Sequence, residues 1–147
     1  MVDDDASIRR LLFRVLAEEN YLVLTAATGD EALELAGQRQ VDLVLLDLNL
    51  PPQNGWEIFE QLATEQPLLP VIIITGRPNQ LFPAVASGAG ALMEKPLDIP
   101  KLLRTIRDLM AEPPEVRQAR TAGRPAEFHY LPPKRLEPAA PPRPGHP

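Results

Sequence analysis

The 147-residue sequence contains no cysteine, so neither a disulfide framework nor a thiolate metal site is available to it. Aromatic residues make up only 5%, and no apolar run approaches the roughly 20 residues that span a membrane. Acidic residues follow the first two positions, where a signal peptide would carry positive charge. These absences exclude a disulfide-rich secreted domain and predict no membrane span, with a cytoplasmic location as the default expectation.

Proline, by contrast, is abundant and unevenly placed, because 10 of the 18 prolines lie in residues 111–147. Helical and strand periodicity also end near Glu112. Residues 1–110 carry 9 Lys and Arg against 16 Asp and Glu, a net charge of −7, which disfavours direct contact with nucleic acid. We predict one domain over residues 1–111 and a Pro-rich, disordered tail over residues 112–147.

Short apolar runs typical of strands alternate with segments of helical spacing. The predicted strands are a stub at residues 1–2 and runs at 21–26, 41–47, 71–75 and 91–93. The predicted helices cover about 6–18, 28–38 and 56–64, a short stretch after Asn79, and a stretch that opens at Asp98. This alternation with short connections is typical of a parallel sheet covered by helices on both faces.

Acidic side chains follow two of these strands directly. Asp47 ends a Val- and Leu-rich run, and Asp3 and Asp4 come just after the stub. Because the carboxyl ends of parallel strands meet at one rim of a sheet, these groups converge there. At an effective dielectric near 20, each carboxylate pair would repel by roughly 3–4 kcal/mol, which favours binding of a cation. All-oxygen ligands favour Mg²⁺ or Mn²⁺.

A lysine and a hydroxyl are expected at the same rim. Lys95 follows a short apolar strand and would supply a positive charge for phosphate oxygens, while the Thr75 hydroxyl could donate to another and Gly76 keeps that corner open. Each residue alone has an ordinary explanation as a turn or cap residue, as Asp5 does for the first helix. Their joint arrangement predicts a pocket for a divalent cation and a phosphoryl group.

With these motifs in place, residues 1–110 resemble a response regulator receiver domain. The motifs that carry the resemblance are Val2-Asp3-Asp4, Asp47-Leu48-Asn49-Leu50-Pro51, Asn54-Gly55, Ile74-Thr75-Gly76, and Gly88 through Lys95-Pro96. The resemblance implies a flavodoxin-like, doubly wound sheet of five parallel strands in the order 2-1-3-4-5. The first strand would be truncated, since only Met1 and Val2 precede the acidic pair, and we expect an upstream extension to stabilise the fold.

The resemblance also implies roles for the pocket residues. Asp47 would accept a phosphoryl group from a histidine kinase or a phosphotransfer protein. Mg²⁺ would be bound directly by Asp4 and Asp47, through water by Asp3, and by the backbone carbonyl of Asn49. The protein would be a signalling switch and not an enzyme acting on separate substrates.

The same resemblance makes Thr75 the switch threonine and Lys95 the lysine that pairs with the phosphate, beside Gly76. Leu92 occupies the switch position where the family usually has Tyr or Phe. We therefore expect phosphorylation to change the helix after Asn79 more than residue 92.

Signalling would run through a downstream protein partner, through a homodimer, or through the tail, because no output domain follows the last helix. The only apolar cluster in the tail, residues 128–131, is interpreted as disordered, with a short docking motif as the alternative.

Two other functions are possible for a strand-end Asp nucleophile with Mg²⁺ or for a receiver fold. A haloacid dehalogenase-type phosphatase would need a second Asp where Asn49 stands, and a degenerate receiver would act as a protein-interaction module without phosphate.

Overall fold

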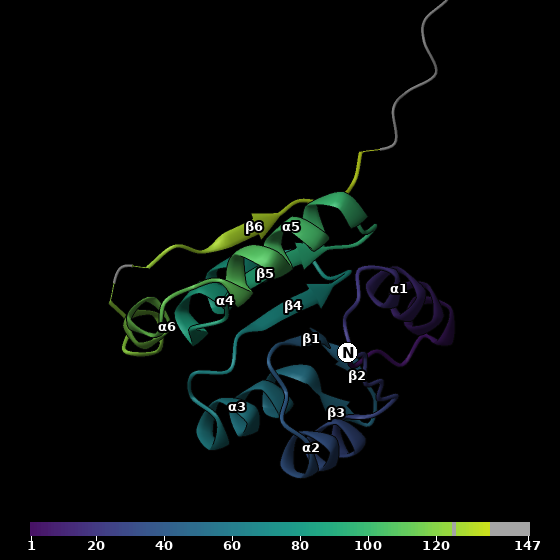
Figure 1. Ribbon diagram of the computed structural model, residues 1–147, viewed down its shortest axis with the longest axis horizontal. Coiled ribbons are helices and arrows are strands. Elements are labelled where there is room, and N and C mark those ends of the chain that lie inside the picture. The colour runs from purple at the N-terminus through teal and green to yellow at the C-terminus, as the bar shows by residue number, and fades with distance from the viewer. Residues whose placement is uncertain (125, 136–147) are drawn as a thin grey trace, which may run out of the picture.

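The computed structural model describes residues 1–124 and 126–135 and centres on a parallel sheet (Figure 1). The strand order is β1-β4-β5-β6, with bounds Val44–Asp47, Val71–Thr75, Ala91–Glu94 and His129–Leu131. A small antiparallel hairpin, β2 (Asn49–Leu50) and β3 (Gln53–Asn54), follows β1. The strands contain mainly Val, Leu and Ile, which suits residues buried on both faces.

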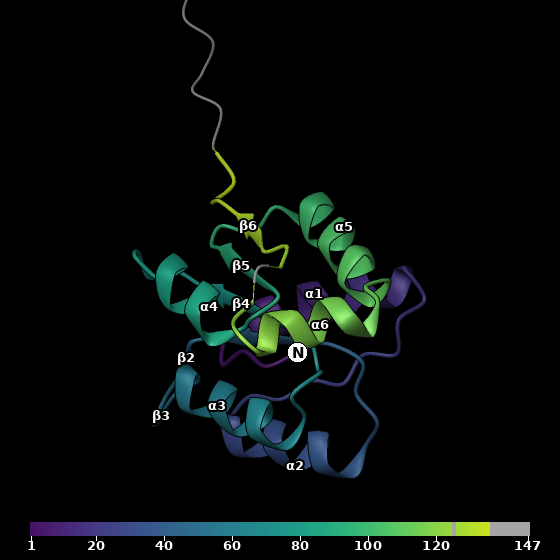
Figure 2. The same cartoon turned by 90° about the vertical axis from the view of Figure 1, so that its left-hand side faces the viewer.

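Helices cover both faces of this sheet. Their bounds are α1 (Ala6–Glu18), α2 (Gly29–Gln38), α3 (Gly55–Glu65), α4 (Leu81–Ser87), α5 (Ile99–Met110) and α6 (Pro114–Thr121). Buried residues of α2, α3 and α4 pack in one cluster, and those of α1 and α5 pack in the other. Figure 2 shows α2 and α3 together on one side of the sheet, away from α5.

Successive strand residues alternate between the two clusters. In β1, Leu45 packs with α1 and α5, whereas Leu46 packs with α2 and α3, and Ile72 and Ile73 of β4 divide in the same way. This alternation follows from the two-residue period of a strand, and it buries every residue of β1 and β4. The prediction of a doubly wound α/β sheet is confirmed.

The helices begin where the sequence predicts. Asp5 caps α1, since its carboxylate accepts hydrogen bonds from Ser7 and Ile8 N–H. At α2 the capping box is complete, because Thr28 Oγ1 accepts from Glu31 N–H and the Glu31 carboxylate accepts from Ala27 N–H. Such caps satisfy backbone donors that the first helical turn leaves unpaired.

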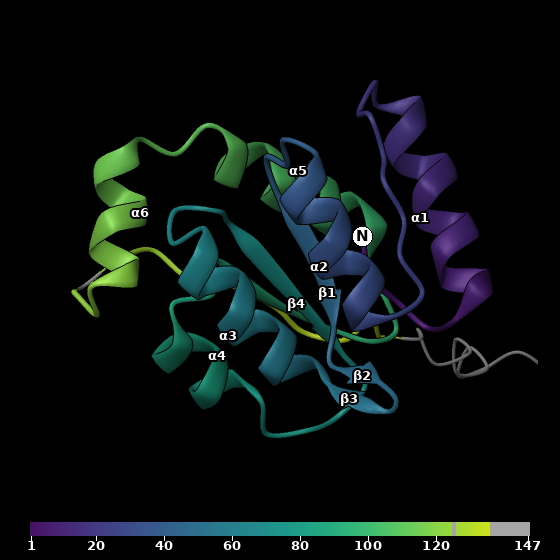
Figure 3. The ribbon, with the colours of Figure 1, turned by 90° about the horizontal axis from the view of Figure 1, so that it is seen from below.

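The expected strand at residues 21–26 is not formed as predicted. Val2 makes single parallel bridges to Ala26 on one side and to Leu46 of β1 on the other, so the order 2-1-3-4-5 is retained. Met1 lies between α1 and β1 in Figure 3. In the described part of the chain, the backbone N–H groups of Leu22 to Thr25 have no hydrogen-bond partner. The prediction failed because a strand needs a neighbour along its length, and the stub bonds only to Leu24, whose carbonyl accepts from the Met1 ammonium at 2.7 Å, and to Ala26.

The expectation of a disordered tail over residues 112–147 is wrong for residues 114–121 and 129–131. Residues Pro114–Thr121 form α6, and His129–Leu131 form β6, which pairs in parallel with β5. The apolar cluster at residues 128–131 therefore docks within the chain itself. Leu131 is buried against α5, which outweighs the low periodicity of the segment. Residues 136–147 of the predicted tail lie outside the described residues.

Candidate functional site

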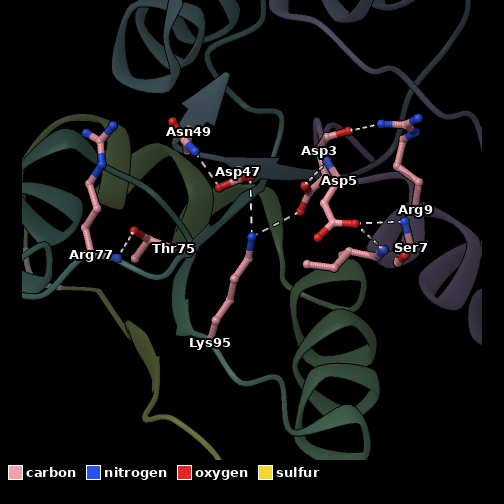
Figure 4. Close-up of polar contacts among 10 residues, drawn as sticks. Asp3, Asp5, Ser7, Arg9, Asp47, Asn49, Thr75, Arg77 and Lys95 are labelled. Carbon is pink, nitrogen blue, oxygen red and sulfur yellow. Dashed lines mark hydrogen bonds and ion pairs between the residues drawn. The ribbon is translucent and has the colours of Figure 1, made fainter. Parts of the chain in front are cut away.

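A lysine lies between two buried carboxylates at the carboxyl rim of the sheet. The Lys95 Nζ atom is 3.4 Å from Asp3 Oδ2 and 3.4 Å from Asp47 Oδ2 (Figure 4). The two carboxylates are 1% and 2% exposed, whereas the Lys95 side chain is 25% exposed. Two nearly buried negative charges therefore share one positive charge that solvent can reach.

The short amino-terminal stub is sufficient to bring its acid to β1. Asp47 N–H donates to the Val2 carbonyl at 2.9 Å, and Asp3 N–H donates to the Ala26 carbonyl at 3.2 Å. These bonds hold Asp3 beside Asp47 even though no full strand precedes them. On the other side of the pocket, Lys95 N–H donates to the Thr75 carbonyl at 2.8 Å, which ties the ends of β4 and β5 together.

Three carboxylates form a candidate cation site. Asp3, Asp4 and Asp47 each offer an oxygen, and these oxygens all lie within 4.8 Å of one another. Asp3 and Asp47 are buried, whereas Asp4 is exposed at the mouth. A set of carboxylate oxygens open to water on one side fits Mg²⁺, which keeps several of its waters. The predicted Mg²⁺ ligands are therefore brought together, and Asn49 follows Asp47 closely, with its N–H donating to Asp47 Oδ1 at 3.1 Å.

The pocket alters the acidity of its central carboxylate. Burial, the largest cause, and the nearby Asp3 carboxylate together raise the pKa of Asp47 from 3.8 to about 6, against the opposing effects of the Asn49 N–H and the Lys95 ammonium. The ionised form of Asp47 therefore carries an electrostatic cost that an added cation would relieve.

The other predicted residues lie around this centre. Thr75 is buried, and its Oγ1 accepts a hydrogen bond from Arg77 N–H at 2.9 Å, so the hydroxyl hydrogen is free for another acceptor. A side chain at Gly76 would meet only Lys95 Cδ, at 4.0 Å, which leaves that corner open as predicted. Leu92 is fully buried in the cluster with α2 and α3 and does not line the pocket.

Two further residues support the pocket, and the sequence pointed to only one of them. Arg9 of α1 donates from its Nη1 to the Asp3 carbonyl at 2.6 Å. At Gly55, a Cβ would lie 2.4 Å from Leu48 Cα and 2.7 Å from the Asp47 carbonyl oxygen, so only glycine lets α3 start this close to the acid. The Asn54-Gly55 turn pointed to the glycine, but nothing in the sequence pointed to the arginine.

The arrangement matches one known family. The sequence profile of the response regulator receiver domain matches residues 1–107. This chain belongs to the response regulator receiver family. Family membership confirms the predicted two-component signalling class and the flavodoxin-like fold. It also agrees with an acidic Mg²⁺ pocket and with histidine kinases or phosphotransfer proteins as the class of partner.

Curated relatives share about a third of their residues with this chain. The transcriptional regulatory protein GlrR of Escherichia coli is 34% identical over 114 residues, which cover 76% of this chain and 26% of GlrR. The response regulator ArlR of Staphylococcus aureus is 36% identical over 118 residues, which cover 78% of this chain and 53% of ArlR. The chain thus spans about half or less of the length of these relatives.

Solved receiver structures share the fold. The receiver domain of NtrX from Brucella abortus has a TM-score of 0.72 at 29% identity, covering 76% of this chain and 97% of that one. TrrA from Thermotoga maritima, solved in complex with Mg²⁺ and BeF, has a TM-score of 0.68 at 29% identity, covering 74% and 94%. The described part of the present chain has no helix long and apolar enough to cross a membrane.

Proposed function

We propose that this receiver takes a phosphoryl group on Asp47 and signals through a phosphorylation-dependent protein contact. The observation that supports it most directly is the Lys95 ammonium held 3.4 Å from both Asp3 and Asp47. A lysine shared by two buried carboxylates is placed to neutralise a third anion entering the same space. The donor would be a phosphohistidine on a histidine kinase or a phosphotransfer protein.

The side chains of the pocket account for the transfer. An Asp47 Oδ atom forms the new P–O bond as the P–N bond of the donor breaks. The electron pair of the P–N bond stays on that imidazole nitrogen, and the ring leaves as neutral imidazole because its other nitrogen carries a proton. Asp47 must be ionised to attack, and its pKa of about 6 leaves it ionised at neutral pH. Lys95 and the Thr75 hydroxyl would bind the phosphoryl oxygens, which gain charge in the transition state.

Asp3, Asp4 and Asp47 would hold Mg²⁺ together with the Asn49 carbonyl. When bound, the cation offsets the repulsion between phosphate and the carboxylates. Arg9 and the two backbone bonds of the stub keep Asp3 in place for this role.

We propose a switch and not an enzyme with a separate substrate. The lysine and the carboxylates surround a single acceptor, Asp47, so the phosphoryl group would be transferred to the chain itself. Acyl phosphate replaces a carboxylate by a bulkier and more negative group, which can shift the loops after β4 and β5 between two conformations. Downstream protein binding or homodimerisation would follow from that shift.

Intact-mass analysis after incubation with acetyl phosphate and Mg²⁺ tests the proposal. We expect one added phosphoryl group on the full chain, retained in an Asp42→Asn variant, whose aspartate is exposed and outside the pocket, and lost in Asp47→Asn. An adduct that survives Asp47→Asn would contradict the assignment. Turnover of a separate phosphoester would favour an enzyme, and a wild-type chain without adduct would favour a phosphorylation-independent receiver.

A further inference from the structure

The strand β6 and the residues just after it form hydrogen bonds to the chain on both sides of Lys95. The Tyr130 hydroxyl donates a hydrogen bond to the carboxylate of Glu94, the residue just before Lys95. Lys134 N–H donates to the carbonyl of Pro96, the residue just after it, at 2.9 Å. Tyr130 of β6 and Lys134 just beyond it therefore contact the two residues that flank the lysine of the pocket.

The strand β5 connects this segment to the site. Glu94 pairs in register with Thr75 of β4, and Leu92 pairs in register with Tyr130 of β6. Figure 1 shows β6 beside β5 at the edge of the sheet. Because β5 pairs with β4 on one side and with β6 on the other, a movement of Thr75 and Lys95 that displaces β5 also displaces the partner of β6.

The hold on β6 is limited. The strand has three residues, and Tyr130 is 44% exposed. Its one buried side chain is Leu131, which is 3% exposed and packs in the cluster with α5. The His129 N–H donates to the Gly90 carbonyl at 3.3 Å. Edge strands this short are among the parts of a fold that open at low free-energy cost.

The segment leading into β6 is held independently. Arg120 is buried, forms an ion pair with Glu112, and donates to the Glu127 carbonyl at 3.2 Å. Opening at Tyr130 and Leu131 would therefore leave α6 in place. It would also leave the N–H and C=O groups on the outer edge of β5 without partners, and such an edge accepts an extended peptide.

We propose that the outer edge of β5 is a strand-binding surface for a partner's extended, apolar segment, and that β6 is its built-in, releasable occupant. This inference rests on the proposed phosphorylation of Asp47. The observed contacts of β6 belong to the unmodified pocket, in which Lys95 is shared by Asp3 and Asp47. A phosphoryl group that draws Lys95 and Thr75 to itself favours a different arrangement of β5, and so disfavours the docked strand.

Hydrogen exchange on the full chain tests the release. After phosphorylation with acetyl phosphate and Mg²⁺, we expect residues 127–134 to exchange about tenfold faster, while α6 remains protected. Intact mass of the same sample reports the adduct. An adduct with unchanged or slower exchange in residues 127–134 overturns the release and leaves the proposed function standing, whereas absence of an adduct counts against the proposed function itself.

A synthetic peptide with the sequence of residues 127–134 tests the surface without relying on phosphorylation. We expect it to bind a Leu131→Asp variant of the full chain at least about tenfold more tightly than the wild-type chain, because the edge is then open. A peptide carrying the same Leu131→Asp change is the matched control and should not bind. Equal affinity of the first peptide for both chains, or no binding to either, overturns the surface.

The contact between Tyr130 and Glu94 can be examined with a conservative change. Tyr130→Phe keeps the ring and removes the hydroxyl, and we expect it to raise exchange in residues 127–134 of the unphosphorylated chain by about threefold. Tyr21→Phe, at the only other tyrosine, is the matched control and should leave these residues unchanged. If both variants behave alike, the Tyr130 hydroxyl does not hold β6.

Discussion

On one side of β1 the sheet continues through a single residue, Val2, whereas beyond β5 it continues through the three-residue strand β6. The sequence suggested the reverse, since residues 21–26 have a strand-like pattern and residues 129–131 follow a proline-rich stretch. The two regions differ in whether a neighbouring strand is available to pair with the backbone. At residues 21–25 only Leu24 is bonded to the stub, through its carbonyl, which accepts from the Met1 ammonium at 2.7 Å, while β6 meets an open edge of β5 and a place for Leu131 beside α5.

The largest expected difference between these regions is in the free energy of unfolding that a leucine-to-alanine substitution removes. Leu46→Ala removes a fully buried side chain from β1 and is expected to lower the free energy of unfolding by about 3–4 kcal/mol. Leu22→Ala, at an 86% exposed residue of the unpaired segment, should change it by less than about 0.5 kcal/mol. Chemical denaturation measures both. A comparable cost at Leu22 would show that the unpaired side is covered in solution.

At the added strand, Leu131→Ala should have an intermediate effect. We expect a loss of about 2 kcal/mol in the free energy of unfolding, at the lower end for a buried leucine, because β6 can open without disrupting the rest of the sheet. Denaturation followed by the fluorescence of Trp56, which lies in α3, reports this loss. No measurable loss would mean that β6 is not docked in solution.

Asp47 is bonded to Val2 on one side and paired with Lys95, which follows β5, on the other, and its acidity makes stability depend on pH. Its folded pKa of about 6 lies above the ordinary value of 3.8, so the folded state binds the proton more tightly. Stability that is present below pH 4 is therefore lost as the pH rises through 6. In Mg²⁺-free buffer, Asp47→Asn should be more stable than the wild-type chain above pH 6, by an amount on the order of 1–2 kcal/mol.

The comparison is made by thermal denaturation across this pH range. The stability difference between Asp47→Asn and the wild-type chain should shrink as the pH falls through 6 and level off below 3.8, where the aspartate becomes protonated in the unfolded state as well. A difference that stays constant with pH would show that the substitution acts through packing and not through charge.

The smallest expected effect comes from filling the gap beside residues 21–25. A groove of about 390 Å³, lined by apolar side chains that include Leu24, Leu43 and Ile106, adjoins Met1. Three valines added ahead of Met1 would give the Leu24 N–H a partner and would replace the buried terminal ammonium, whose pKa burial lowers to about 6. We expect a gain of about 1 kcal/mol in the free energy of unfolding.

Thermal denaturation of two matched extensions checks this. A Gly-Ser-Gly extension of the same length moves the terminal charge away from Met1 equally but has no apolar side chains for the groove. Equal stabilities of the two extended chains would show that the groove does not select an apolar strand.

Much of the site was predictable because strand ends are marked by abrupt changes from apolar to polar residues. Asp47, Thr75 and Lys95 each follow such a run, and a parallel sheet brings these ends to one rim. Helix starts were predictable for a similar reason, since caps such as Asp5 act over two or three residues. These are local signals that the sequence carries in full.

The remaining features depend on groups that are distant in sequence. The pairing of β6 with β5 joins residues 38 positions apart, and nothing near His129 marks its partner, Ala91. The prediction of a strand at residues 21–26 was wrong for the opposite reason. The local pattern suits a strand, but no neighbouring strand of sufficient length is present.

The close approach of Gly55 to β1 fixes the start of α3 against the strand that carries Asp47. A Cβ at Gly55 would lie 2.4 Å from Leu48 Cα and 2.7 Å from the Asp47 carbonyl oxygen, and main-chain atoms cannot rotate away as a side chain can. The Lys95 side chain on the other side of Asp47 is 25% exposed and can change its rotamer. We therefore expect a modification of Asp47 to displace Lys95 and the end of β5 before it displaces α3.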